Sequence, residues 1–252
     1  MLYFYKNNLI DDATLSTNGS NSATLDNVKN DIPTIAYNDT DGSGIKIEID
    51  LGSAKAVDAC LITGNYLQGL GFTSCELRGS ASTDFSGSTV HTLEVNSDNR
   101  IALKNFTEET FRYWELTFNS GEVDISNIFL GAATKIENNG ITHKSFTYEK
   151  VDNSKSQFNN FGQKFASKYS KQKMISGTID LINASEFAIL TDIWEDKGTT
   201  DPIWFILDKD DNLDITDSKY IFSGMFHINK KFQFKMVAPN LYQLKVELLE
   251  TM

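Results

Sequence analysis

The sequence predicts an all-β protein of two domains, and three observations support this prediction. Short apolar or alternating segments recur roughly every 8–12 residues, separated by Gly, Ser, Asp and Asn. Only one segment of the 252 residues has convincing helical spacing. The charge changes midway, because residues 1–131 carry eight basic and 18 acidic side chains, whereas residues 132–252 carry 15 and 16.

The first half contains the clearest strand patterns. An opening strand is expected at 2–5 and 9–10, and residues 11–44 form a long polar loop region with little periodicity. Further strands are expected at 45–51, 57–64, 73–80, 89–95, 100–104, 111–119 and 123–131. Segment 45–51 alternates apolar and polar residues, as a strand with one buried face does. Short strands at this spacing are typical of a β-sandwich.

Residues 132–140 form the expected domain boundary, and the second half is again rich in strand patterns. Its one expected helix is 183–197, where Asn183 and Glu186 approximate a capping box and Gly198 supplies the stop. Four apolar residues share one face of this helix: Phe187, Leu190, Ile193 and Trp194. Strands are expected at 141–151, 174–181, 202–207, 219–228, 231–238 and 241–249.

Composition narrows the classes of function. The chain is 40% apolar and 12% aromatic, which is enough for a substantial core, and its net charge of −11 disfavours nucleic acid or an anionic membrane as a ligand. No run approaches the roughly 20 apolar residues of a membrane span, and the apolar start ends at Lys6, so no signal peptide is expected. Cys60 and Cys75 are expected to be buried thiols, although they could pair if their strands are adjacent.

Four segments of the first half resemble the first and last strands of the galactose-binding-like, or discoidin-like, jelly roll. They are Ile45–Ser53, Val57–Thr63, Phe111–Phe118 and Ile125–Gly131. The resemblance implies that residues 1–132 form a β-sandwich of the binding type. It favours an attachment or adaptor protein over an enzyme.

The second half resembles the ring-forming domain of phage tail proteins, of which distal tail proteins and tail-tip adaptors are the closest group. The resemblance is carried by Ser176–Leu181, Pro202–Asp208, Tyr220–Phe226 and Tyr242–Leu249 around the single helix. It implies that residues 137–252 form a β-barrel or sandwich that assembles into a homo-oligomeric ring of the virion tail. In that family the ring domain usually comes first, whereas here the sandwich does.

Together the two resemblances predict a structural component of a phage or phage-derived tail tip or baseplate, made in the host cytoplasm. The first domain would contact other tail or baseplate proteins, or a glycan on the host surface. The alternative is a soluble carbohydrate-binding protein with an accessory β-domain. The lysine-rich stretch 144–173 is expected to contact a neighbouring subunit rather than nucleic acid, because it contains no arginine and the protein is acidic overall.

The sequence offers little support for catalysis. Its three histidines, His91, His143 and His227, do not have the spacing of metal ligands, and no nucleophile elbow or phosphate-binding loop is present. Carboxylates are numerous enough that a glycosidase pair stays open, but nothing places two of them across a cleft. The protein is therefore expected not to be an enzyme.

One loop offers ligands for a structural calcium ion. Asn38, Asp39 and Asp41 carry the amide and carboxylate oxygens that this cation prefers. A solvated turn explains the same residues, since turns favour Asp, Asn and Gly. The acidic loop 208–214 is not expected to bind calcium, because Leu213 occupies the glycine position of an EF-hand loop.

A glycan site would need aromatic rings with amide or carboxylate groups on loops of the sandwich. The candidates in loop-like segments are Tyr37, Asn65, Tyr66, Gln68 and Phe85. Three further aromatic residues, Phe111, Tyr113 and Trp114, lie in an expected strand and are assigned to the core. A structural or docking role for the domain is the alternative to glycan binding.

Overall fold

The computed structural model describes residues 2–29, 35–39, 44–64, 75–95, 101–118, 123–136, 147–152, 155–158, 164–167, 171–208 and 221–250. Its contacts divide the chain into two units, each of which is described by itself. Unit 1 is Met1–Lys135 with Trp204–Gly224, and unit 2 is Ile136–Ile203 with Met225–Met252. The predicted all-β class is confirmed, because the described elements are mostly antiparallel strands. The division into domains 1–132 and 137–252 stays a prediction.

The elements of the first part of the chain are nine strands and a short 3-10 helix among the described residues. They are β1 (Leu2–Tyr5), β2 (Thr14–Thr17), η1 (Ser22–Lys29), β3 (Tyr37–Asp39), β4 (Lys46–Gly64), β5 (Cys75–Ser80), β6 (Thr89–Val95), β7 (Ile101–Phe118), β8 (Val123–Gly131) and β9 (Thr134–Ile136).

The later elements surround the predicted helix. They are β10 (Thr147–Asp152), β11 (Lys155–Phe158), β12 (Lys164–Ser167), β13 (Lys171–Asn183), α1 (Ala184–Lys197), β14 (Ile203–Asp208), β15 (Ile221–Ala238) and β16 (Leu241–Glu250). The predicted capping box is present at the start of α1, where the side chain of Asn183 accepts from the backbone N–H of Glu186 and the Glu186 carboxylate accepts from the N–H of Asn183.

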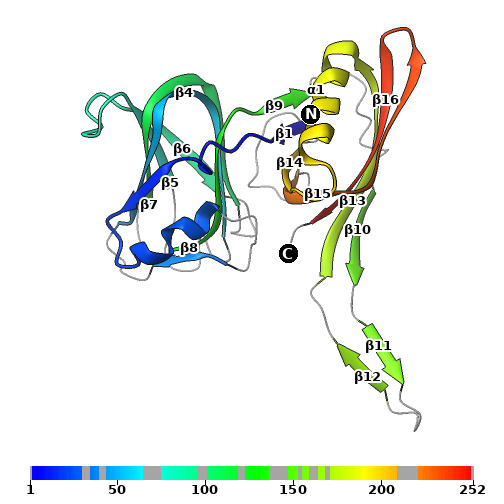
Figure 1. Ribbon diagram of the computed structural model, residues 1–252, viewed down its shortest axis with the longest axis horizontal. Helices are drawn as coiled ribbons and strands as arrows, with labels where there is room; N and C mark the ends of the chain where they lie inside the picture. The colour runs from blue at the N-terminus through cyan, green and yellow to red at the C-terminus, as the bar shows by residue number, and fades with distance from the viewer. Residues whose placement is uncertain are drawn as a thin grey trace. The chain divides into compact units, whose positions relative to one another are not determined.

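Unit 1 contains a curled antiparallel sheet (Figure 1). Its strands have the order β3-β8-β4-β7-β5-β6, and β2 pairs with β4. Strand β4 changes neighbours along its length. Residues 46–50 pair with both β2 and the last third of β7, whereas residues 59–64 pair with β8. Because β4 and β7 each run through both layers, the sheet closes over one core. This topology confirms the predicted galactose-binding-like jelly-roll sandwich.

The long strands differ from the shorter ones that the sequence predicts. Residues 45–51 and 57–64 are expected as two strands, but both belong to β4. Gly52 has a φ of 71° and the pairing register shifts between Asp50 and Lys55, so the chain bulges here without turning back. The segments expected at 100–104 and 111–119 are likewise joined in β7.

Two further differences concern the start of the chain. The region expected as a loop, 11–44, contains β2, η1 and β3. Strand β1 does not join the curled sheet but pairs with β14, with Leu2 opposite Leu207 and Tyr5 opposite Trp204. This long-range pairing explains why residues 204–224 group with unit 1.

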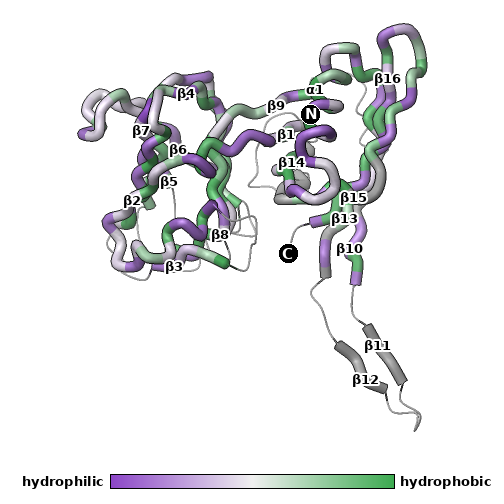
Figure 2. Tube along the Cα trace, in the orientation of Figure 1, coloured by the Kyte–Doolittle hydropathy of each residue, from purple (hydrophilic) through white to green (hydrophobic). Residues whose placement is uncertain are grey.

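The core of unit 1 lies between the layers of the curled sheet. It includes Ile47, Ile49, Leu77, Trp114 and Leu116, all at most 1% exposed. Hydrophobic and hydrophilic residues mix along the strands (Figure 2), as the alternation of a sheet with one buried face requires. Cys60 and Cys75 belong to the same core and are free thiols. Burial raises the pKa of both thiols, so thiolate chemistry is suppressed.

Unit 2 contains strands in the order β10-β13-β16-β15, together with α1. Aromatic side chains of the helix pack on the last two strands. The Phe187 ring stacks on Tyr242 at 4.1 Å between centroids, and Trp194 stacks on Phe232 at 5.5 Å. These contacts confirm the predicted helix packed on a β-domain.

Candidate functional site

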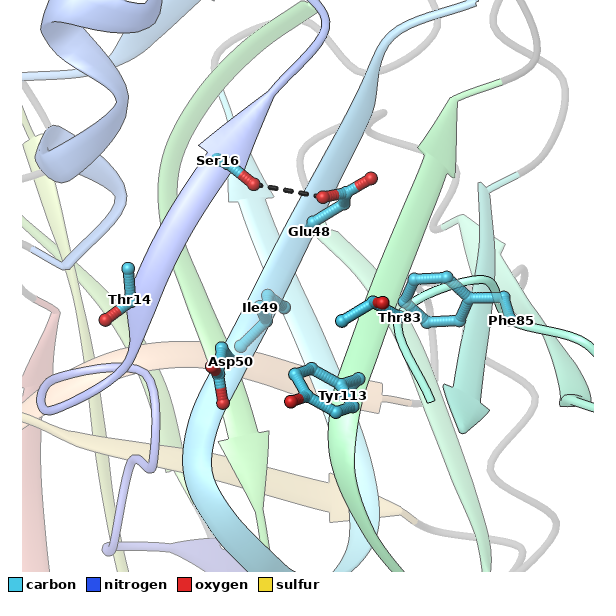
Figure 3. A pocket seen from close by; sticks show the side chains of 8 residues that line it. All are labelled: Thr14, Ser16, Glu48, Ile49, Asp50, Thr83, Phe85 and Tyr113. Carbon is cyan, nitrogen blue, oxygen red and sulfur yellow. Dashed lines mark hydrogen bonds between the residues drawn. The ribbon is translucent and has the colours of Figure 1, made fainter. Parts of the chain in front are cut away.

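A pocket of about 220 Å³ lies on the solvent-facing side of unit 1, over β2, β4 and β7 (Figure 3). Its lining combines aromatic rings with hydroxyl and carboxylate groups. The lining residues are Thr14, Ser16, Glu48, Ile49, Asp50, Thr83, Phe85 and Tyr113. We call this the outer-face pocket.

The strand register explains why these residues meet. Asp50 lies opposite both Thr14 of β2 and Tyr113 of β7, and Glu48 lies opposite Ser16. Residues directly opposite each other in an antiparallel pair project from the same face. The alternate residues of β4 point into the core, which leaves this polar row on the outside.

An ion pair fixes one side of the pocket. The Arg112 guanidinium donates from Nε to Asp50 Oδ1 at 2.7 Å and from Nη2 to Oδ2 at 2.8 Å. The backbone N–H of Gly52 donates to the same carboxylate at 2.8 Å. These donors lower the pKa of the Asp50 carboxyl group, and Arg112 has the largest effect. The side chain therefore stays an anion. The guanidinium also lies 4.8 Å from the centroid of the Tyr113 ring, which restrains that ring.

The loop between β5 and β6 brings Phe85 to the pocket. Phe85 has a φ of 51°, and its N–H donates to the carbonyl of Ser82. Asp84 Oδ1 accepts from the hydroxyls of Ser82 and Ser86 and from the N–H of Ser86. These bonds lower the pKa of Asp84 and hold the loop that carries Phe85.

Glu48 differs from the other charged residues of this sheet face. Its Oε2 accepts from the Ser16 hydroxyl at 3.1 Å, and the side chain is exposed. Glu48 forms no ion pair with any described residue. Its strand partner Glu115, by contrast, accepts from Lys46 Nζ at 3.0 Å. The pocket therefore holds one carboxylate with spare acceptor capacity.

The residues predicted for a glycan site differ in where they lie in the structure. Phe85 lines the outer-face pocket. Tyr37 is not on a loop but in β3, where it is 0% exposed, and its hydroxyl donates to Asp39 Oδ2 at 2.9 Å. Burial raises its pKa to about 12. Its ring is therefore part of the core rather than a platform for a ligand. Asn65, Tyr66 and Gln68 lie outside the described residues.

The predicted calcium ligands are only partly described. Asp39 is buried, and its carboxylate accepts from Tyr37, from the Ser20 hydroxyl and from the N–H of Asn21. Asn38 is exposed, and Asp41 lies outside the described residues. Among the residues that are described, no group of three or more His, Cys, Asp or Glu side chains could hold a metal ion. The calcium site stays a prediction.

Of the eight residues that line the pocket, sequence reasoning found only Phe85, and the residues that it missed include Glu48, Asp50 and Tyr113. Trp114 is buried as expected, but its neighbour Tyr113 is only half-buried and faces outward. The signal was available, because consecutive residues of a strand point to opposite faces. A buried Trp114 therefore predicts an outward Tyr113. Phe85 was predicted because it lies in a loop-like segment of the sequence.

No protein-family model and no curated protein matches the sequence. Within the described part of the chain, no helix is long and apolar enough to cross a membrane.

Several solved structures are similar to about half of the chain. Chitosan-binding module 1 of a chitosanase/glucanase from Paenibacillus sp. IK-5 is 16% identical, with a TM-score of 0.42, covering 50% of this chain and 99% of that chain. A Ruminococcus gnavus GH29 fucosidase is 19% identical, with a TM-score of 0.42, covering 51% and 27%. CpGH89CBM32-6 of Clostridium perfringens is 16% identical, with a TM-score of 0.39, covering 49% and 98%. With TM-scores below 0.5, these likenesses assign no ligand to this chain.

Proposed function

We propose that unit 1 is a non-catalytic carbohydrate-binding module and that the outer-face pocket is its site. The observation that supports this most is the lining of that pocket. Two aromatic side chains, Tyr113 from β7 and Phe85 from the β5–β6 loop, line it together with the carboxylates of Glu48 and Asp50 from β4. Sugar rings present apolar C–H faces to aromatic rings, and their hydroxyls donate to carboxylates.

The pocket suits binding better than turnover. Asp50 is held as an anion by Arg112, so it is a poor source of a proton, and its oxygens are already engaged. The hydroxyls of Thr14, Ser16 and Thr83 add donors and acceptors at the rim. Because the groups sit on paired strands, they need little ordering when a ligand binds, which favours affinity.

The test of this proposal is a glycan array, followed by calorimetric titration with the glycans that bind. We expect Tyr113→Ala to weaken binding about tenfold or more, because the ring contributes contact area at the centre of the site. Val90→Ala is the matched control, since Val90 is an exposed residue of the same unit, is 48% exposed, and does not line the pocket. Equal affinities for the wild type and Tyr113→Ala would refute the assignment of the site.

A structural role in a phage tail is the second candidate, and an observation in unit 2 favours it. Among the described residues of this unit, four large apolar side chains are exposed: Leu181, Ile189, Met236 and Val237. Met236 lies opposite Tyr242, and Leu181 directly precedes Ile182, the other strand partner of Tyr242. Exposed apolar groups gathered at one end of a sheet are typical of protein–protein contacts. In this proposal unit 2 forms the ring, other tail proteins are the neighbours, and the virion is the location.

Light scattering across a concentration series tests the second candidate. A closed oligomer that Met236→Glu dissociates, while Lys235→Glu does not, would support it. Lys235 is the matched control because it is also exposed and is adjacent in β15. A protein that stays at the 28.2 kDa of one chain at all concentrations would count against assembly through unit 2 alone.

A further inference from the structure

We infer that the outer-face pocket prefers a sugar that carries an ammonium group, with Glu48 as the residue that recognises it. This inference rests on the proposed carbohydrate-binding function and concerns the class of sugar. Other charged residues on this sheet face are paired with one another. Three ion pairs, Asp50 with Arg112, Glu115 with Lys46 and Glu76 with Arg78, have N–O distances of 2.7, 3.0 and 3.1 Å.

Glu48 is left without a cation in this arrangement. It shares no ion pair among the described residues, and only the Ser16 hydroxyl donates to it, through Oε2. Its Oε1 therefore remains available to a ligand. Glu115 lies opposite Glu48 on β7, but it is buried and paired with Lys46, so Glu48 is the carboxylate that a ligand meets.

The net negative charge of the unit also favours a cationic ligand over an anionic one. Residues 1–131 carry eight basic and 18 acidic side chains. A ligand with a carboxylate or sulfate group would meet repulsion here, and a neutral sugar would gain no charge pairing with Glu48. An ammonium group would form an ion pair with Glu48 while the sugar ring contacts Tyr113 and Phe85. Charge-assisted hydrogen bonds are about twice as strong as neutral ones.

The experiment compares three β-1,4-linked oligomers of equal length, built from glucosamine, N-acetylglucosamine and glucose. Calorimetric titration is carried out at a pH where the glucosamine amine is protonated. We expect the wild type to bind the glucosamine oligomer about tenfold more tightly than the two neutral oligomers. Glu48→Gln should remove this preference, because it should lower the affinity for the glucosamine oligomer more than the affinity for the two neutral oligomers.

Glu94→Gln is the matched control. Glu94 is a partly exposed carboxylate of unit 1, paired with Lys104 at 3.6 Å, and it does not line the pocket. This variant should retain the preference. Added salt should reduce the preference of the wild type, because exposed charges are screened.

Three results would overturn the inference while the proposed function stands. The first is equal affinity of the wild type for all three oligomers, and the second is a preference that survives in Glu48→Gln. The third is binding of only neutral or anionic glycans on the array. If the array shows no glycan bound at all, both the inference and the proposed function are wrong.

Discussion

The two faces of the sheet made by β4 and β7 differ in what their side chains do, although they alternate along the same strands. Ile47, Ile49 and Trp114 point inward and are at most 1% exposed. Glu48, Asp50 and Tyr113 are each next to one of these residues in the sequence and line the outer-face pocket. The inner face carries the stability of the unit, and in our proposal the outer face carries recognition.

This comparison shows how a sandwich can vary its ligand without losing its fold. A substitution on the outer face removes a contact with a ligand but leaves the core packing intact. A substitution on the inner face opens a cavity and acts on binding only through unfolding. The two faces are coupled by the backbone that they share, and the Asp50–Arg112 pair joins β4 to β7 on the outer face.

The largest expected effect is on the inner face. Trp114→Ala should lower the free energy of unfolding by about 3–5 kcal/mol, because it deletes a fully buried aromatic side chain of the core. Tyr113→Ala, one residue away, should cost less than about 1 kcal/mol. Urea denaturation measures both values. Similar losses for the two variants would contradict the division between the faces.

A smaller effect is expected for Arg112, which holds Asp50 and Tyr113 in place on the outer face. Arg112→Lys keeps the charge but loses the two-pronged contact with Asp50 and the position over Tyr113. We expect glycan affinity to fall several-fold with little change in the midpoint of thermal unfolding. Arg78→Lys is the control, since its partner Glu76 lies outside the pocket lining. A loss of affinity in the control as large as in Arg112→Lys would show a general charge effect instead.

The smallest effect concerns the loop that carries Phe85. The hydrogen bonds from Ser82 and Ser86 lower the pKa of Asp84, so this carboxylate stabilises the folded state above the unfolded pKa of about 4. That contribution is lost as the pH falls through the lowered pKa of the folded state. Asp84→Asn should therefore slightly lower the midpoint of thermal unfolding at neutral pH, and the gap to the wild type should close on acidification. A gap that widens at low pH would show that Asp84 acts in another way.

Local patterns predicted much of this fold. The bounds of β6 and β8 agree with the expected 89–95 and 123–131, and α1 begins directly after the predicted cap Asn183. The pairing of β1 with β14 was not predicted, because partners some 200 residues apart leave no local signal. The Gly52 bulge resembles a turn in sequence, which explains why β4 was predicted as two strands.

The candidate site was predicted less well than the fold. Phe85 was identified, but Tyr37 was taken for a loop residue although its hydroxyl is satisfied inside the core by Asp39. Tyr113 was assigned to the core with its neighbours, whereas the half-buried ring faces the pocket. Which aromatic residues of a strand face solvent depends on register, and register is set by partners far along the chain.

A crystal structure of the protein with the glycan that binds best on the array tests the central claim most directly. The account predicts an ordered sugar in the outer-face pocket, with its ring against Tyr113 and its polar groups within hydrogen-bonding distance of Glu48. An ordered sugar elsewhere on the jelly roll, with the outer-face pocket empty, would contradict it.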